Sequence, residues 1–126
     1  MGSAYGDLGD ALKKRDYLER ALRIEESHYG PEHPEVGITL TSLGNAYGSL
    51  GDAFKQRDYL ERALRIKESH YGPLRIMESH YGPEHPEVAI TLGMLGSAYG
   101  SLGDASKQRD HQERALLIFE SHYGPE

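Results

Sequence analysis

Histidine is the residue type in this sequence most able to do chemistry, because it binds metals and transfers protons near neutral pH. Most of the seven histidines lie in a recurring segment, HYGPEH, or in shortened forms of it, as do His28 and His33 and again His80 and His85. The Gly-Pro between each pair interrupts a helix, so the two rings do not share a helical face. No cysteine or local acid completes a four-ligand set. We therefore predict no metal site and assign these histidines to helix ends and turns.

The acidic residues also lack a pattern that would support catalysis. The sequence contains no His-Glu-x-x-His, Gly-x-Ser-x-Gly or phosphate-loop motif. Acidic and basic residues alternate at helical spacing, as at Glu61, Arg62 and Arg65, which is typical of a solvated, salt-bridged helix face. We therefore predict that the protein is not an enzyme, has no catalytic residues and needs no cofactor.

The composition excludes several partners. Lysine and arginine number 14 against 20 aspartates and glutamates, a net charge of −6, whereas a nucleic-acid-binding surface needs to be basic. No run approaches the ~18 apolar residues of a membrane span, and residues 1–7 do not resemble a signal peptide. There are no cysteines to form disulfides. We expect a cytoplasmic protein that contacts neither nucleic acid nor membrane.

The histidine segments recur because the whole chain is repetitive. Ala4–Pro31 matches Ala46–Pro73 at 24 of 28 positions, and Ala98–Pro125 matches the second copy at 23 of 28. The first spacing is 42 residues and the second 52, because Leu64–Pro73 is followed by a near copy of itself at 74–83. We predict a single repeat domain over 1–126, with copies that start near Ala4, Ala46 and Ala98 and a ten-residue duplicated insert.

Each unit is predicted to form two helices and no strand. His33-Pro34-Glu35 is a start signal, with a polar capping residue, proline at the first helical position and an acid beside the helix dipole. This first helix ends at Gly51, and Asp52 caps a second helix that ends near 71–73. Each internal glycine costs the first helix about 1 kcal/mol relative to alanine. We therefore expect Gly44 and Gly96 to allow close approach of a neighbouring helix.

The residues Leu43-Gly44-x-x-Tyr47, then Gly51-Asp52 and Ala63-Leu64, resemble the tetratricopeptide repeat. The 42-residue period resembles the type found in kinesin light chains. The resemblance implies an all-α fold, an α-solenoid of antiparallel helix pairs stacked as a right-handed superhelix. It also implies a concave face, lined by the first helix of each unit, that binds a peptide or protein partner.

Mapping that concave face onto this sequence gives an uncharged surface of mostly small side chains. The predicted partner-binding residues are Ile38, Thr41, Asn45, Ser49, Ile90, Met94 and Ser97. Asn45 is the one side chain here able to bond a peptide backbone as both donor and acceptor, although a solvated surface asparagine is an equal alternative. Lysines that would clamp a carboxylate terminus are missing from both first helices, so no ligand class follows from the resemblance.

A second hypothesis comes from the insert and the terminal helices. Ala4-Tyr5-Gly6 is expected to be the end of a first helix. The complete helices then follow in the order second, first, second, first, second, which leaves both terminal helices with uncovered apolar surface. The insert is expected to break the helix near Gly72, to add a short helix from Pro73 to about Tyr81 and to displace the third copy from the second. This predicts a self-assembling module, a domain-swapped or intertwined homo-oligomer. Its contacts would come from Leu74, Met77, Leu116 and Phe119.

Overall fold

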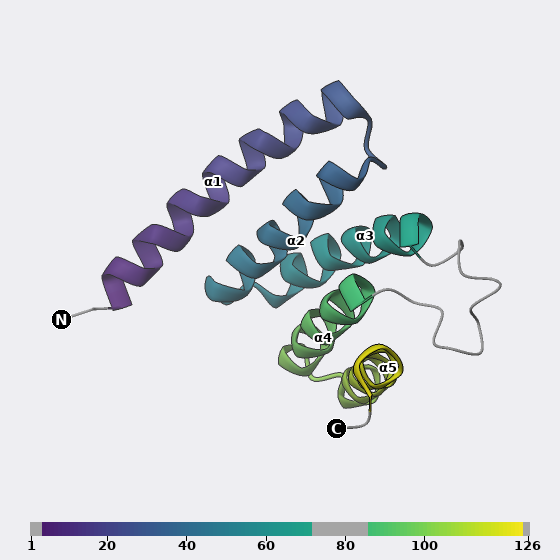
Figure 1. Cartoon of the computed structure of the whole chain (residues 1–126). Helices are drawn as coiled ribbons and strands as arrows, with labels where there is room; N and C mark the ends of the chain where they lie inside the picture. Colours follow the sequence, from purple (N-terminus) through teal and green to yellow (C-terminus); the bar gives the residue numbers. More distant parts are fainter. Residues whose placement is uncertain (1–3, 72–85, 125–126) are drawn as a thin grey trace.

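The computed structural model describes residues 4–71 and 86–124, which form five α-helices (Figure 1). The helices are α1 (Ala4–Tyr29), α2 (Pro34–Ser49), α3 (Ala53–Tyr71), α4 (Pro86–Ser101) and α5 (Ala105–Tyr123). Each helix packs against the next one along the chain, and α2 also contacts α4. The predicted all-α solenoid is confirmed, as is the order of helices within the units.

The helix boundaries follow the predicted capping residues. The His33 ring accepts a hydrogen bond of 3.0 Å from the backbone N–H of Glu35, and Pro34 opens α2. Asp52 accepts from the N–H of Lys55 at 3.1 Å, and Asp104 caps α5 in the same way. Gly51 has a positive φ of 82°, which only glycine adopts without strain, and it closes the turn between α2 and α3.

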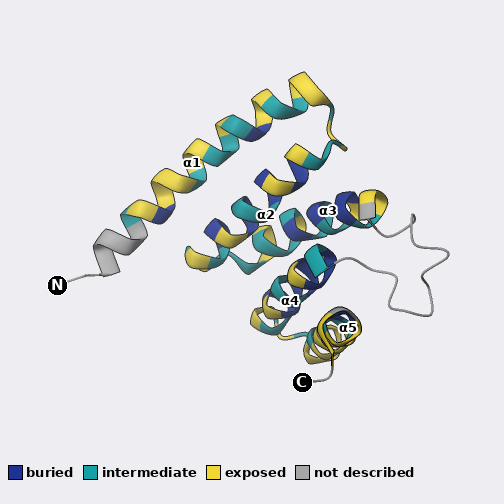
Figure 2. Cartoon of the chain, in the orientation of Figure 1, coloured by how far each residue is buried: buried dark blue, intermediate teal, exposed yellow. Residues whose placement is uncertain are grey.

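The buried residues lie on the helix faces that pack together (Figure 2), and in the described part of the chain they form three apolar clusters. The fully buried side chains of largest volume include Leu40 and Leu43 of α2, Leu60 of α3, and Leu92 and Leu95 of α4. Gly44 and Gly96 let the helices approach as predicted. A Cβ on Gly44 would stand 2.6 Å from Leu60, and one on Gly96 would stand 2.8 Å from Gln112.

One predicted boundary is wrong. Ala4-Tyr5-Gly6 was expected to end a helix of the α2 type, followed by a turn like the one at Gly51. The structure instead continues α1 without a break from Ala4 through Gly9 to Tyr29. In the described residues no helix precedes α1, so no hairpin partner holds Gly9 in a turn, and the segment stays helical.

The predicted displacement of the third copy is also wrong, because the same contacts form on both sides of the insert. Two contacts join α1 to the pair α2 and α3: Tyr47 donates to Glu19, and Arg62 pairs with Glu26. The corresponding residues join α3 to the pair α4 and α5: Tyr99 donates to Glu61, and Arg114 pairs with Glu68. The α3–α4 interface therefore repeats the α1–α2 interface although ten more residues separate the helices. The predicted short helix, with Leu74 and Met77, lies outside the described residues.

Deletion of residues 74–83 is expected to raise the free energy of unfolding by about 1 kcal/mol. The connection from α3 to α4 spans 72–85, whereas the one from α1 to α2 spans only 30–33, and a shorter closed loop loses less chain entropy on folding. Urea denaturation followed by circular dichroism at 222 nm measures the change. A large loss of stability would show that the insert supports the stacking of α4 on α3.

Candidate functional site

The predicted partner-binding residues lie on the sides of α2 and α4 that face solvent. Ile38 is 57% exposed and Ile90, at the corresponding position of the next unit, is 45% exposed. Asn45, Ser49 and Ser97 are exposed as well, and Thr41 is half-buried. The seven side chains carry no formal charge, and α2 and α4, the helices that bear them, contact each other. These seven residues are called the strip below.

The strip offers few fixed hydrogen-bonding groups. The Thr41 hydroxyl donates to the carbonyl oxygen of Gly37 at 2.9 Å, so its proton is already used within the helix. Met94 is half-buried and packs against Leu60, Leu95 and Tyr99, which makes it more a core residue than a surface residue. Asn45 therefore supplies the polar contact most able to recognise a backbone, and the isoleucines supply the apolar ones.

Charged residues that the sequence analysis placed on a solvated face prove to link the helices. Glu61 accepts a hydrogen bond from the Tyr99 hydroxyl of α4. Arg62 pairs with Glu26 of α1 at 2.7 Å. Glu19 accepts from two tyrosines, Tyr47 of α2 and Tyr59 of α3, the latter at 3.2 Å from each carboxylate oxygen. The prediction of a purely solvated face is wrong for these residues.

Lys67 makes a further contact that sequence reasoning missed. Its side chain is buried, with Nζ 3.1 Å from the Thr91 hydroxyl and 3.3 Å from a carboxylate oxygen of Glu87. The equivalent residue of α1 is Glu25, which accepts a hydrogen bond of 2.5 Å from Thr39. Either a glutamate or a lysine can therefore occupy this position of the repeat and contact the threonine. The repeat period alone does not indicate that the position lies at an interface between helices.

The tyrosines of these contacts hold their protons more tightly than exposed tyrosines do. Burial of Tyr99, its hydrogen bond to Glu61 and the negative charge of that carboxylate raise its pKa from 10.0 to about 12. Burial and Glu19 also raise the pKa of Tyr47. The folded state therefore binds these protons more tightly than the unfolded state. The resulting stability is fully present below pH 10 and is lost as the pH rises towards 12.

The stability of the wild-type chain is accordingly expected to fall between pH 10 and 12 more steeply than that of a Tyr99→Phe variant. Urea denaturation at pH 9 and at pH 11.5 provides the comparison. Tyr17→Phe, which removes a hydroxyl from a side chain that is 70% exposed, serves as the control. If the free energy of unfolding fell equally with pH in Tyr99→Phe and in the wild-type chain, the result would contradict the role assigned to the Tyr99 hydroxyl.

The described residues contain neither a metal-binding cluster nor a membrane-spanning helix. Over 4–71 and 86–124, no three histidines, aspartates or glutamates gather closely enough to hold a metal ion. The same part of the chain has no helix that is both long and apolar enough to cross a membrane. His33 acts as a helix cap, with the Tyr29 ring stacked on it at 4.4 Å. His80 and His85 lie outside the described residues.

The terminal helices each expose apolar side chains. Tyr17 and Ile24 of α1 are 70% and 68% exposed. Leu116 of α5 is 56% exposed, whereas Phe119 is half-buried and packs against the α4–α5 core. Of the four predicted self-association residues, Leu116 and Phe119 are therefore partly accessible.

Comparison with protein families matches both ends of the described chain to the same kind of repeat. One tetratricopeptide repeat model matches residues 1–69, and a second matches residues 88–126. Both models are typical of kinesin light chain-like repeats. No curated protein matches the sequence.

Proposed function

Because the chain belongs to the tetratricopeptide repeat family, whose repeats generally mediate contacts between proteins rather than catalysis, we propose that it is a scaffold for one partner. The partner binds along the solvent-facing strip of α2 and α4. The observation that carries the proposal is the pair of exposed isoleucines, Ile38 and Ile90, at equivalent positions of two adjacent helices.

The chemistry of the strip favours an uncharged, extended peptide segment as the partner. The strip residues carry no formal charge, so they provide no electrostatic attraction for an acidic or basic motif. Two exposed isoleucines provide apolar contact for two side chains of the segment. Asn45 follows Ile38 along α2 and can donate to and accept from the peptide backbone.

Selection from a random dodecapeptide library displayed on phage tests this proposal. Peptides selected on the wild-type chain should lose binding to an Ile38→Ser, Ile90→Ser variant and to Asn45→Asp. Leu117→Ser is the matched control, because Leu117 is 63% exposed on α5 and lies outside the strip. Failure to enrich any peptide, or equal binding to all these variants, would overturn the proposal.

Self-assembly is the second candidate function, and the outer side of α1 favours it. Ile24 is 68% exposed, whereas Ile66 and Ile118 at the same position of the other units are 3% and 5% exposed. Burial of such a side chain contributes about 1.5–3 kcal/mol, which a second copy could supply. Light scattering across a hundredfold concentration range should then show a multiple of 14.1 kDa that Ile24→Asp abolishes. A monomer at every concentration would exclude this function.

A further inference from the structure

The strip crosses from one helix pair to the next, because Ile38 lies on α2 and Ile90 lies on α4 (Figure 1). α2 packs with α3 in one unit, and α4 packs with α5 in the following unit. The two units are joined where α4 lies on α3. The distance between the two isoleucines therefore depends on how the start of α4 is held on α3.

Apolar contacts hold the start of α4 mainly to α5. The buried residues of this cluster all come from these two helices: Val88, Ala89, Leu92, Ala115 and Ile118. In the described part of the chain, Leu64 is the α3 residue that packs against the cluster. The hydrophobic effect has no preferred direction, so one such contact constrains the rotation of α4 on α3 only weakly.

Lys67 supplies a directional contact at this place. Its Nζ lies 3.1 Å from the Thr91 hydroxyl oxygen and 3.3 Å from a carboxylate oxygen of Glu87. Thr91 and Glu87 are about one helical turn apart and lie on either side of Ile90 in the sequence. Only 10% of the Lys67 side chain is exposed, so a shift of α4 that broke both contacts would leave a buried ammonium group without acceptors. The two contacts therefore favour one placement of Ile90.

The start of α2 is held in a different way. Glu25 of α1 accepts a hydrogen bond from Thr39, the residue after Ile38. α2 also follows a short connection, residues 30–33, whereas the connection before α4 spans 72–85. A longer connection restricts the following helix less. A side-chain contact is therefore more important for the placement of α4 than for that of α2.

We propose that Lys67 is a positioning residue of the strip. Through Thr91 and Glu87 it fixes the place of Ile90, so that one bound segment reaches both isoleucines. Lys67 itself is buried and acts through α4 rather than on the peptide. The effect on peptide affinity rests on the proposed function, whereas the placement of Ile90 can be measured without a peptide.

A distance measurement between two spin labels tests the placement. The sequence has no cysteine, so Ile38→Cys and Ile90→Cys provide the two labelling sites, and double electron–electron resonance gives the distribution of their distance. Lys67→Met should broaden this distribution. Methionine keeps a long apolar side chain in the buried site but cannot bond Thr91 or Glu87. The Thr91 hydroxyl keeps its own hydrogen bond to the backbone carbonyl oxygen of Glu87.

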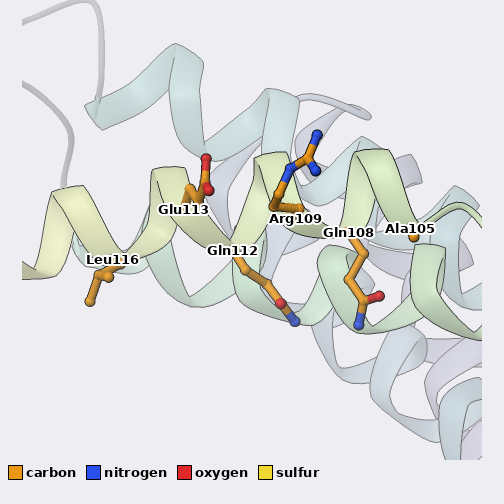
Figure 3. Close-up of a pocket in the computed structure, with 6 residues that line it drawn as sticks. All are labelled: Ala105, Gln108, Arg109, Gln112, Glu113 and Leu116. Atoms are coloured by element: carbon orange, nitrogen blue, oxygen red, sulfur yellow. The ribbon is translucent and has the colours of Figure 1, made fainter.

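Two control variants remove a positive charge elsewhere. Arg62→Met breaks the ion pair of α3 with Glu26, which belongs to α1 and not to α4. Arg109→Met acts on α5, where Arg109 lines an open groove of about 410 Å³ (Figure 3). Neither change should broaden the distance distribution. The double change Lys67→Glu, Glu87→Lys reverses the ion pair and should restore the narrow distribution.

A peptide selected on the wild-type strip measures the consequence for binding. Lys67→Met should weaken its affinity about threefold to tenfold, because the strip must then be ordered as the peptide binds. In a chain that already carries Ile90→Ser, the same change should have no effect, since no isoleucine remains there to be placed. A residue that acted on overall stability alone would weaken binding in both chains.

Three results would overturn the proposal: an unchanged distance distribution in Lys67→Met, an equal broadening in Arg62→Met and Arg109→Met, or an equal loss of affinity with and without Ile90. Broadening that is confined to Lys67→Met and reversed by the exchange of charges supports it. If the broadening is seen but no peptide can be selected on the wild-type chain, the positioning stands and the proposed function fails.

Discussion

Replacement of Leu60 by alanine is expected to lower the free energy of unfolding by about 2–5 kcal/mol. The Leu60 side chain is 0% exposed and lies where three helices meet. It packs against Leu95 and Tyr99 of α4, and its Cγ lies 2.6 Å from the place that a Cβ on Gly44 of α2 would take. Removal of this side chain opens a cavity that neither neighbouring helix can fill without moving its backbone.

Urea denaturation measures the loss, and hydrogen exchange shows where it acts. Amides of α4 and α5 should lose more protection than those of α1, because α4 is anchored on α3 partly through Leu60. Leu117→Ala is the control; as an exposed residue it should change stability by no more than about 0.5 kcal/mol. A similar small change for Leu60→Ala would show that α2, α3 and α4 are not packed as described.

A double-mutant cycle tests the same junction from the other side. Gly44→Ala improves helix propensity by about 1 kcal/mol, yet its new methyl group would overlap the buried Leu60 side chain. The single variant is therefore expected to lose stability. In combination with Leu60→Ala the methyl group fills part of the cavity, so the double variant should lose less than the two single changes added together.

The repeat period and the capping residues were sufficient to predict α2 to α5, but not the start of α1. His33, Pro34 and Asp52 act through contacts with backbone two or three residues away, so their effect is local and readable in the sequence. Gly44 and Gly96 were predicted to permit close packing because a glycine inside a helix otherwise has only a cost. Their partners, Leu60 and Gln112, came only from the structure.

The hydrogen bonds and ion pairs that charged residues make between helices could not be predicted in the same way. Arg62 and Glu61 are spaced on α3 as solvated residues would be, and their partners lie 36 and 38 residues away. The spacing of charges along one helix does not reveal which neighbouring helix they face.

The effect of the insert was misjudged for a related reason. A loop can grow by ten residues at little cost, so the contacts between helices, rather than the connection, determine how α4 stacks on α3.

The binding role of the strip stays a prediction, and the structure gives only the exposure of its residues: Thr41 and Met94 are half-buried and the other five are exposed. Helical spacing correctly separated the solvent-facing side of α2 and α4 from the core side. The role proposed for Lys67 could not be predicted, because the first unit has a glutamate at the same position and the third has a phenylalanine. Its contacts with Thr91 and Glu87 depend on which helix covers that position.

Replacement of Glu19 by leucine is expected to cost about 2–3 kcal/mol. Glu19 accepts hydrogen bonds from Tyr47, which is 6% exposed, and from the half-buried Tyr59, so its loss leaves two hydroxyls without an acceptor. Glutamate and leucine have similar helix propensities, and the change therefore reports on the contact rather than on α1 itself. Urea denaturation at neutral pH gives the value.

Internal repetition supplies the controls for this prediction. Glu61→Leu should cost about half as much, because Glu61 accepts from Tyr99 alone and His111 stands in the third copy where Tyr59 stands in the second. Glu113→Leu, at the same position of α5, should change stability by no more than about 0.5 kcal/mol, since it lines an open groove. Adding Tyr47→Phe and Tyr59→Phe to Glu19→Leu should restore part of the loss, because the unpaired hydroxyls are then gone. Equal costs at Glu19, Glu61 and Glu113 would show that the carboxylates act through helix α1, α3 or α5 alone and not through the interfaces between units.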